Sequence, residues 1–339
     1  MSLDPQAESL QSALQAAVLA GWRSAANSDP STPNQTTTGP VAVAYSGGVD
    51  STALLHTMTK LGLPVQAVHV NHQLQDVAAD WPAHCRRVCA MLGVPLTVLT
   101  VQVDRNDGTG LEAQARAARY AAIGQWMLDS GITQLWLGHH RDDQVETVLL
   151  QLLRGSGLRG IAGMPPVGPW PSAQYSHQLI RPLLQWSKED LRTCVALAGL
   201  PCVDDPSNSD VSLRRNWLRE VMLPQLRSEF PQTDHAVLRL AEHFQEFFAQ
   251  RDATQGPLLD QLLDQQGRLK LAAWQMLEEP LQRDILHTWL GQHGIRCGRD
   301  ALIELHRQLT HTDKGGVRQV KAGWAVRVHR GWVSVVTQE

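Results

Sequence analysis

A short polar run near the start of the chain has the composition of an anion-binding turn. It consists of Ser46, Gly47, Gly48, Val49, Asp50 and Ser51. Adjacent glycines let the backbone come close to a ligand, and free N–H groups at the start of a helix favour negative charge. These features, with the two serine hydroxyls, predict a site for phosphate groups. A carboxylate beside phosphates is repelled unless a cation lies between them, so Asp50 is predicted to hold magnesium.

The flanking residues favour this interpretation over an ordinary helix N-cap formed by Asp50 or Ser51. Before the turn, residues 41–44 are wholly apolar, which is typical of a strand buried on both faces. After it, apolar residues recur at helical spacing over residues 53–58. The turn has neither the Gly-Lys-Ser/Thr of a Walker loop nor the Gly-x-Gly-x-x-Gly of a dinucleotide-binding turn.

A second chemical signal is a pair of carboxylates, Asp143 and Glu146, at the start of a predicted helix. At a spacing of three residues both side chains point the same way from the helix. Two carboxylates side by side repel each other unless they hold a cation. Either a metal ion or the ammonium group of a substrate would satisfy them. Asp142, directly before the pair, is predicted to cap the helix.

Histidines stand at the ends of two further predicted strands, as the pairs His69 with His72 and His139 with His140. Without cysteine partners or a His-Glu-x-x-His frame, metal ligation is the weaker interpretation of these pairs. We expect them instead to contact a nucleotide or to support the residues that do so.

Arginines and an aromatic residue cluster beyond residue 210, namely Arg214, Arg215, Trp217 and Arg219. This combination suits a nucleic-acid backbone and a stacked base. The alternative is a solvated helix face with Trp217 in the core. A further basic residue, Arg154, opens the glycine-rich turn 154–160.

The elements that must position these residues alternate between strand and helix. Strands are predicted at residues 41–44, 64–70, 96–101, 134–137 and 179–184. Helices are predicted at 5–24, 77–92, 111–129 and 187–199, and from 142 onward. The alternation predicts an α/β fold, a Rossmann-like parallel sheet with helices on both faces, whose ligands bind beyond the carboxyl ends of the strands. The Pro-rich residues 164–175 are predicted to be irregular.

After residue 231 the pattern predicts a smaller, mainly helical domain with a short β element. Its helices are expected at 234–251, 258–265, 274–293 and 299–310, and a β-hairpin or meander at 317–336. The stretch 296–330 holds eight Lys or Arg against three acidic residues, which favours contact with nucleic acid. The predicted domains are an N-terminal helix and flexible connector (1–40), a catalytic domain (41–226) and a helical nucleic-acid-binding domain (227–339), whose ligand the resemblance given below implies to be tRNA.

Composition limits the class of protein. A net charge of −3 and a pI near 6.5 give no global basic field, so nucleic acid must be bound by a local patch. The five cysteines form no Cys-x-x-Cys pair, which predicts a reducing, cytoplasmic setting without structural zinc or an iron–sulfur cluster. Neither a leader nor an apolar run of membrane length is found, so no membrane partner is expected. The oligomeric state is left open, a homodimer included.

Taken together, these blocks resemble the bacterial tRNA(Ile)-lysidine synthetases, within the PP-loop ATP pyrophosphatase superfamily. The matching segments are 46–51, 69–72, 112–120, 139–147, 154–157, 181–183, 205–208 and 215–216. The resemblance implies ATP-dependent ligation of lysine to C2 of the wobble cytidine in a tRNA(Ile) with a CAU anticodon. An adenylated cytidine would be the intermediate, AMP and pyrophosphate would be released, and the tRNA would change identity from Met to Ile.

The resemblance also implies roles for single residues. ATP would lie on residues 46–51 with His69 nearby, and Asp50 would hold Mg²⁺. The catalytic residues would be Asp50, His139 and Arg119. Free L-lysine would be bound by Asp143 and Glu146. The tRNA would be contacted by Arg154, Arg214, Arg215 and Arg219.

Two rival functions are weighed against this one. A tRNA thiolase built on the same loop needs catalytic cysteines or a Cys-x-x-Cys near the site, and the sequence has none there. A nucleotide-dependent binding module without chemistry is disfavoured by the paired carboxylates. The further C-terminal domain of longer family members is not expected in this chain.

Overall fold

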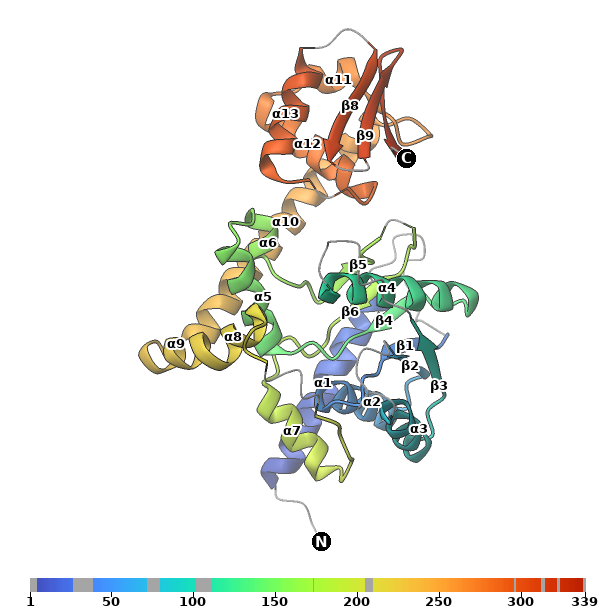
Figure 1. Ribbon diagram of the computed structural model, residues 1–339, viewed down its shortest axis with the longest axis vertical. Helices are drawn as coiled ribbons and strands as arrows, with labels where there is room; N and C mark the ends of the chain where they lie inside the picture. The colour runs from blue at the N-terminus through green and yellow to red at the C-terminus, as the bar shows by residue number, and fades with distance from the viewer. Residues whose placement is uncertain are drawn as a thin grey trace. The chain divides into compact units, whose positions relative to one another are not determined.

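The computed structural model describes residues 5–26, 39–71, 80–101, 111–172, 174–204, 210–295, 297–311, 315–321 and 324–337. The predicted connector at 27–38, His72 and the motif at 205–208 lie outside these residues. The chain folds into two compact units (Figure 1). The first comprises Met1–Trp170 and Tyr175–Glu242, and the second Pro171–Gln174 and His243–Glu339. Every side chain that the sequence assigns to catalysis, ATP or lysine belongs to the first unit.

The first unit is built on a six-stranded sheet in the order β3-β2-β1-β4-β6-β5. Its strands are β1 (Val41–Ala44), β2 (Val65–Asn71), β3 (Leu96–Thr100), β4 (Gln134–Trp136), β5 (Val167–Pro169) and β6 (Gln178–Ile180). Neighbours are parallel except β5 and β6, which pair antiparallel. The predicted parallel α/β sheet is confirmed. The prediction that residues 164–175 are irregular is wrong for β5, a short edge strand, where a proline is tolerated.

Helices accompany the strands in the predicted alternation. They are α1 (Pro5–Ala26), α2 (Val49–Lys60), α3 (Trp81–Leu92), α4 (Leu111–Asp129), α5 (Arg141–Leu153), α6 (Leu158–Ile161) and α7 (Lys188–Leu197). Then follow α8 (Arg214–Trp217), a π-helical segment (Leu218–Met222), α9 (Leu223–Glu229) and α10 (Thr233–Leu262). The glycine-rich turn 154–160, predicted from sequence, runs into the short helix α6.

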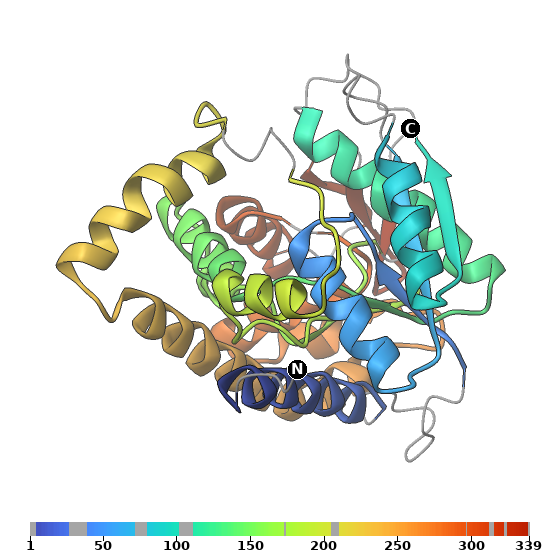
Figure 2. The same ribbon diagram turned by 90° about the horizontal axis from the view of Figure 1, so that it is seen from below.

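The strands bury alternate residues on opposite faces of the sheet, as their period of two requires. Val41 and Val43 of β1 belong to a core shared with α1, α2, α3 and α7. Ala42, between them, belongs to a second core shared with α4. Figures 1 and 2 show the same arrangement, with α2 and α3 together on one side of the sheet. Helices therefore cover both faces of the sheet.

The second unit combines helices with a small antiparallel sheet in the order β7-β10-β9-β8. Its elements include β7 (Leu269–Lys270), α11 (Leu271–Gln275), α12 (Glu279–Gln292), α13 (Arg299–Thr310), β8 (Gly316–Lys321), β9 (Trp324–His329) and β10 (Trp332–Thr337). Trp274 and Trp289 are fully buried in its core. The predicted helical domain with a short β element is confirmed. Among the described helices, none has the length and apolarity that crossing a bilayer requires.

Candidate active site

The polar clusters found in the sequence meet at the carboxyl ends of three adjacent strands. β1 pairs with β2 on one side and with β4 on the other. The predicted phosphate-binding turn, residues 46–51, follows β1 and is called the phosphate-type turn below. His69 lies near the end of β2, and His139 and His140 follow β4. Sheets of this kind bind ligands where neighbouring strands lead their connections to opposite faces, and β1 and β4 form such a point.

The turn after β1 is organised by its own serines. The Ser46 N–H donates to Ser51 Oγ at 3.2 Å, and the Gly48 N–H donates to Ser46 Oγ at 3.3 Å. Gly47 has a φ of +83°, and a Cβ there would lie 3.2 Å from Cys85 Sγ. Gly48 is the N-cap of α2, and no side chain caps this helix. The alternative cap by Asp50 or Ser51 is therefore wrong, and no side-chain cap competes with a ligand for the N–H groups at the start of α2.

Asp50, in the first turn of α2, has a carboxylate that lacks a full set of partners. Its Oδ1 is buried without a hydrogen-bond partner in the described part of the chain. Burial raises the pKa of Asp50, and the nearby Asp143 adds to this, while His140 and Lys188 oppose it. A cation would relieve the cost of the buried charge.

The donor set around Asp50 is compatible with magnesium bound through a nucleotide. Within the described residues, no group of three or more His, Cys, Asp or Glu side chains could hold a metal ion. Mg²⁺ commonly uses one or two carboxylates, waters and substrate phosphates rather than an all-protein cage. Asp50 beside a phosphate-type turn fits that pattern, whereas a metal site made by the histidine pairs does not.

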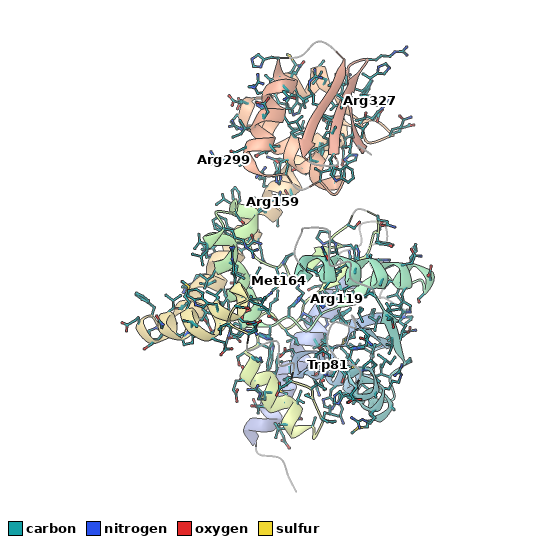
Figure 3. All side chains as sticks on the ribbon, viewed as in Figure 1. Trp81, Arg119, Arg159, Met164, Arg299 and Arg327 are labelled. Carbon is teal, nitrogen blue, oxygen red and sulfur yellow. The ribbon has the colours of Figure 1, made fainter. Side chains whose placement is uncertain are left out.

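His69 contacts the backbone directly before the phosphate-type turn. It is buried, and its Nδ1 lies 2.9 Å from the carbonyl oxygen of Tyr45, which precedes the turn. Because a carbonyl only accepts, the proton of His69 is on Nδ1. Burial lowers the pKa of His69, and the positive charge of Arg119 on α4 contributes (Figure 3). The ATP-binding role of His69 and the catalytic role of Arg119 stay predictions.

Gly138 allows the loop after β4 to reach the phosphate-type turn. A Cβ at this position would lie 2.9 Å from the backbone carbonyl carbon and oxygen of Asp50. Contacts this short with backbone atoms do not occur in folded proteins, so only glycine fits without a shift. The sequence signal was a glycine directly after a buried strand, and its importance was missed.

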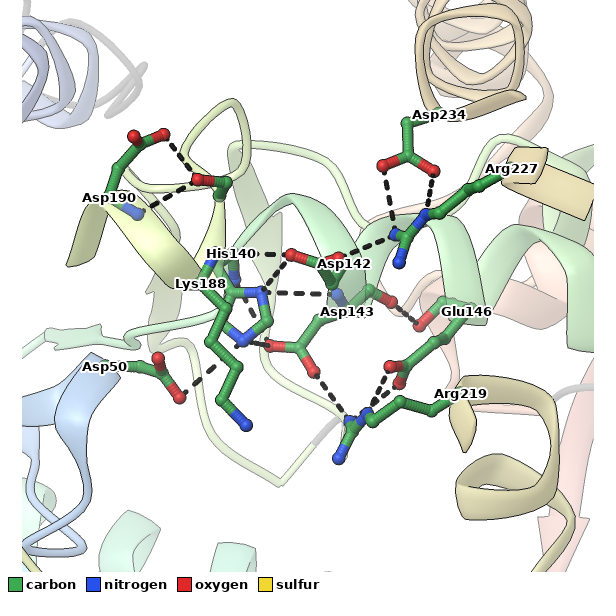
Figure 4. A network of polar contacts seen from close by, with 12 residues as sticks. Asp50, His140, Asp142, Asp143, Glu146, Lys188, Asp190, Arg219, Arg227 and Asp234 are labelled. Atoms are coloured by element: carbon green, nitrogen blue, oxygen red, sulfur yellow. Dashed lines mark hydrogen bonds and ion pairs between the residues drawn. The ribbon is translucent and has the colours of Figure 1, made fainter. Parts of the chain in front are cut away.

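His140 lies at the centre of the site, between the carboxylates of two elements (Figure 4). It is the N-cap of α5, where its Nδ1 accepts the Asp143 N–H at 3.5 Å and Asp143 completes a capping box. The prediction that Asp142 caps this helix is wrong. His140 Nε2 lies 3.6 Å from Asp50 Oδ2 and 3.5 Å from Asp143 Oδ2. One imidazole thus connects the phosphate-type turn with the carboxylate pair.

Asp142 serves a different purpose, because it ties three segments together. Its Oδ1 accepts from Arg227 Nη2 at 2.7 Å, and its Oδ2 accepts from the Lys188 N–H at 3.2 Å. Arg227 also binds Asp234 at 3.0 Å. The side chain of Lys188 runs past the ring of His140, and its charge reaches Asp50 (Figure 4). Lys188 and Arg227 were missed because neither belongs to a recognisable motif.

Asp143 and Glu146 do hold cations, and these are two arginines of the chain itself, of which Figure 4 shows Arg219. Arg215 Nε lies 2.7 Å from Glu146 Oε2, and Arg215 Nη2 lies 3.1 Å from Asp143 Oδ1. Arg219 binds Glu146 through two bonds of 2.6 and 2.9 Å. The Glu146 side chain is 0% exposed. The sequence argument that the pair needs a cation holds, but it did not foresee an arginine in that place.

The remaining basic residues of this region face outward. Arg154 and Arg214 are exposed, and Trp217 is 46% exposed. The alternative interpretation that placed Trp217 in the core is therefore wrong. Asn216 and Leu218, the two neighbours of Trp217, are buried instead. These two residues, and not Trp217, face the interior.

His139 is held as a neutral imidazole by its surroundings. Burial pushes its pKa well below the usual range, and Arg181, Arg116 and Arg215 add to this while Asp143 opposes it. Arg181 Nε donates to His139 Nδ1 at 3.3 Å. The proton of His139 therefore sits on Nε2, which makes that atom a hydrogen-bond donor.

The chain matches two known families. Residues 24–226 match the PP-loop domain family, and residues 269–334 match the TilS substrate binding domain. The tRNA(Ile)-lysidine synthase of Alkalilimnicola ehrlichii is 44% identical over 266 residues, covering 77% of this chain and 58% of that protein. The tRNA(Ile)-lysidine synthase of Neisseria meningitidis is 37% identical over 287 residues, covering 81% and 63%. The chain thus spans about six tenths of the length of these relatives.

A solved structure also resembles the fold. The U34-tRNA thiolase NcsA from Methanococcus maripaludis aligns with a TM-score of 0.55 at 15% identity, over 70% of this chain and 80% of that one. A likeness at this level of identity shows the fold alone.

Gly138→Ala tests the close approach between the two loops. The added Cβ forces the loop after β4 away from Asp50, so we expect about 1–3 kcal/mol loss of stability, typical of overpacking, and weaker ATP binding. Thermal unfolding and nucleotide titration measure the two effects. Gly157→Ala is the control, because its Cβ would meet nothing within 4 Å. Equal behaviour of the two variants would contradict the steric argument.

The neutral state of His139 predicts how stability depends on pH. The unfolded chain takes up a proton near the ordinary pKa of 6.5, whereas the folded chain does not until a lower pH. The contribution of His139 is therefore full above pH 6.5 and is lost as the pH falls below it. We expect His139→Gln to flatten the fall in unfolding free energy between pH 6.5 and 4.5, measured by denaturant titration. The exposed His235→Gln should leave that slope unchanged.

Proposed function

Because the chain belongs to the PP-loop domain family, we propose that it uses ATP to activate an RNA base and then joins lysine to that base. The substrate is the wobble cytidine of a tRNA(Ile) with a CAU anticodon, as the names of the relatives suggest. One observation carries the proposal. Asp50 of the phosphate-type turn has a buried oxygen, Oδ1, without a hydrogen-bond partner in the described part of the chain. The imidazole of His140 lies between Asp50 and Asp143 of the carboxylate pair, which binds cations.

The first half-reaction would take place at the turn. ATP lies on residues 46–51, where backbone N–H groups and serine hydroxyls meet its phosphates. The cytidine O2 attacks the α-phosphate, an O–P bond forms, and pyrophosphate leaves. Asp50 would hold Mg²⁺, which when bound neutralises charge on the phosphates. His139, which is neutral, would donate a hydrogen bond through its Nε2–H. Arg119 would supply positive charge near β2.

The second half-reaction would use the carboxylate pair. The lysine ε-amine attacks C2, an N–C bond forms, and the C2–O2 bond breaks as AMP leaves with O2. The ε-ammonium first loses one proton to solvent to become the nucleophilic amine, and the amine loses a second proton to solvent as the N–C bond forms. Asp143 and Glu146 would hold the ammonium group of lysine, which requires that the substrate replace a guanidinium now bound there.

A local basic surface would bind the tRNA. Arg154 and Arg214 are exposed, and residues 269–334 of the second unit match a substrate binding domain. Neutralising phosphates with such residues gives binding that weakens with salt. We place the reaction in the cytoplasm, where tRNA, ATP and lysine are all available.

The expectation that no cysteine lies near the site is wrong, because Cys85 lies beside Gly47 of the phosphate-type turn. The state of the buried cysteines nevertheless argues against the rival thiolase. Burial raises the pKa of Cys85 to about 12 and that of Cys89 to about 11. Both therefore stay protonated, and a protonated thiol is a poor nucleophile and metal ligand. Lysine-dependent release of AMP, measured with ATP and a tRNA(Ile) transcript, tests the proposal directly. Sulfur transfer without lysine would support the thiolase, and neither reaction would support a binding module.

Asp50→Asn tests the cation at the turn. If Asp50 holds magnesium against the phosphates, the variant should lose tRNA-dependent ATP–pyrophosphate exchange by on the order of 100-fold or more. Its melting temperature should be equal or higher, because a buried charge is removed. Exchange at the normal rate would show that the carboxylate plays no part in adenylation.

Asp143→Asn and Glu146→Gln test the lysine site. Both should raise the lysine KM, while pyrophosphate exchange without lysine persists because the adenylate forms first. Glu146→Gln should also cost about 3–5 kcal/mol of stability, as breaking a buried ion pair does, and Asp143→Asn less. If exchange and ligation fall together and excess lysine rescues neither, the pair binds a metal instead.

A further inference from the structure

The two arginines bound to the carboxylate pair are not equivalent. Arg219 binds both oxygens of Glu146 in a fork-like arrangement, at 2.6 and 2.9 Å, and its Nη2 lies farther from Asp143, 3.9 Å from Oδ1. Arg215 bridges the pair, because it contacts Glu146 Oε2, Asp143 Oδ1 and the Asp143 carbonyl oxygen, the last at 3.2 Å. Arg215 is therefore the arginine with close contacts to both carboxylates, and its guanidinium lies between them.

A substrate ammonium group needs that same place. Two carboxylates and two guanidiniums balance in charge, so a third cation would be repelled. Glu146 is fully buried, and both of its oxygens already accept hydrogen bonds from the two arginines, so neither is free for an incoming ammonium group. If Arg215 left and an ammonium entered, the charges would balance again, with Arg219 still neutralising the buried Glu146.

Arg215 is also the arginine better placed to leave. Its side chain is 35% exposed, against 23% for Arg219. The backbone around it is anchored, since Asn216 Nδ2 donates to the Asp210 carbonyl oxygen at 2.9 Å and Leu218 is buried. A π-helical segment, a feature frequent at functional sites, follows directly after α8. A side-chain movement of Arg215 thus needs no unfolding of the helix.

The surface beside Arg215 suits an RNA phosphate as the alternative partner. Arg214 and Trp217 of the same short helix are exposed, and together they offer a phosphate contact and a stacking surface. A guanidinium binds phosphate as well as carboxylate with two parallel hydrogen bonds.

We propose that Arg215 sets the order in which substrates bind: it fills the lysine site until RNA draws it away to a phosphate. Lysine then enters between Asp143 and Glu146. The inference rests on the proposed function. It explains why a site for a free amino acid is closed in the chain without RNA, and it couples lysine affinity to RNA binding.

Equilibrium dialysis of radiolabelled lysine tests the proposal, with and without an RNA stem-loop carrying the CAU anticodon. The wild-type chain should bind lysine at least about 10-fold more tightly with the RNA, within the usual range of coupling between two sites. Arg215→Gln should bind lysine without RNA as tightly as the wild type binds it with RNA. Arg215→Lys, which keeps the charge, should lie between them.

The control is Arg192→Gln, an exposed arginine of α7 that pairs with Glu189 at 3.6 Å. It should keep the wild-type response to RNA. The proposal is overturned if Arg215→Gln retains the RNA response, or if a normally melting Arg215→Gln binds no lysine. Wild-type lysine binding that ignores RNA also overturns it, while leaving the proposed function standing. No wild-type lysine binding in either condition, with no lysine-dependent AMP release, removes both.

Discussion

The structure depends on neutralising four carboxylates at one edge of a sheet. Asp50, Asp142 and Asp143 come from the first turns of α2 and α5, where backbone N–H groups already favour negative charge, and Glu146 lies one turn further along α5. That help is insufficient for side chains this close together. Each therefore has a basic neighbour, and these are His140, Lys188, Arg215, Arg219 and Arg227. The basic neighbours bring the later elements of the first unit to the strand ends.

This charge balance explains why the later segments fold as they do. Arg215 and Arg227 lie 69 and 85 positions after the carboxylates they bind. Their helices α8 and α9 are short, four and seven residues, and such helices are marginal alone. Ion pairs with α5, together with buried Leu218 and Leu223, fix them in place. The edge of the sheet thus organises a region that has no strand of its own.

The sequence predicted the parts of the site that are local. A strand, a glycine turn and a helix start are encoded within a dozen residues, and the clusters after β1, β2 and β4 meet because parallel strands share one edge. The long-range partners of Asp143 and Glu146 were not predictable, because no periodicity links residue 146 to 215. The cap of α5 was misassigned since acidic residues are common in any first turn, whereas a histidine cap is rare. The role of Gly138 was not predictable either, because it depends on how close the backbone of Asp50 lies in the folded chain.

The buried pair of Glu146 with two arginines is better explained by function than by stability. Replacing such a group with apolar residues of similar volume is often neutral or stabilising, because desolvating charges costs as much as their attraction returns. Apolar contacts of Leu218 and Leu223 with Val145 already help to hold the segment after α8 against α5. A carboxylate pair gains something else from being paired within the chain. Under the proposed function, it keeps its charge and its geometry until lysine replaces one of the two arginines.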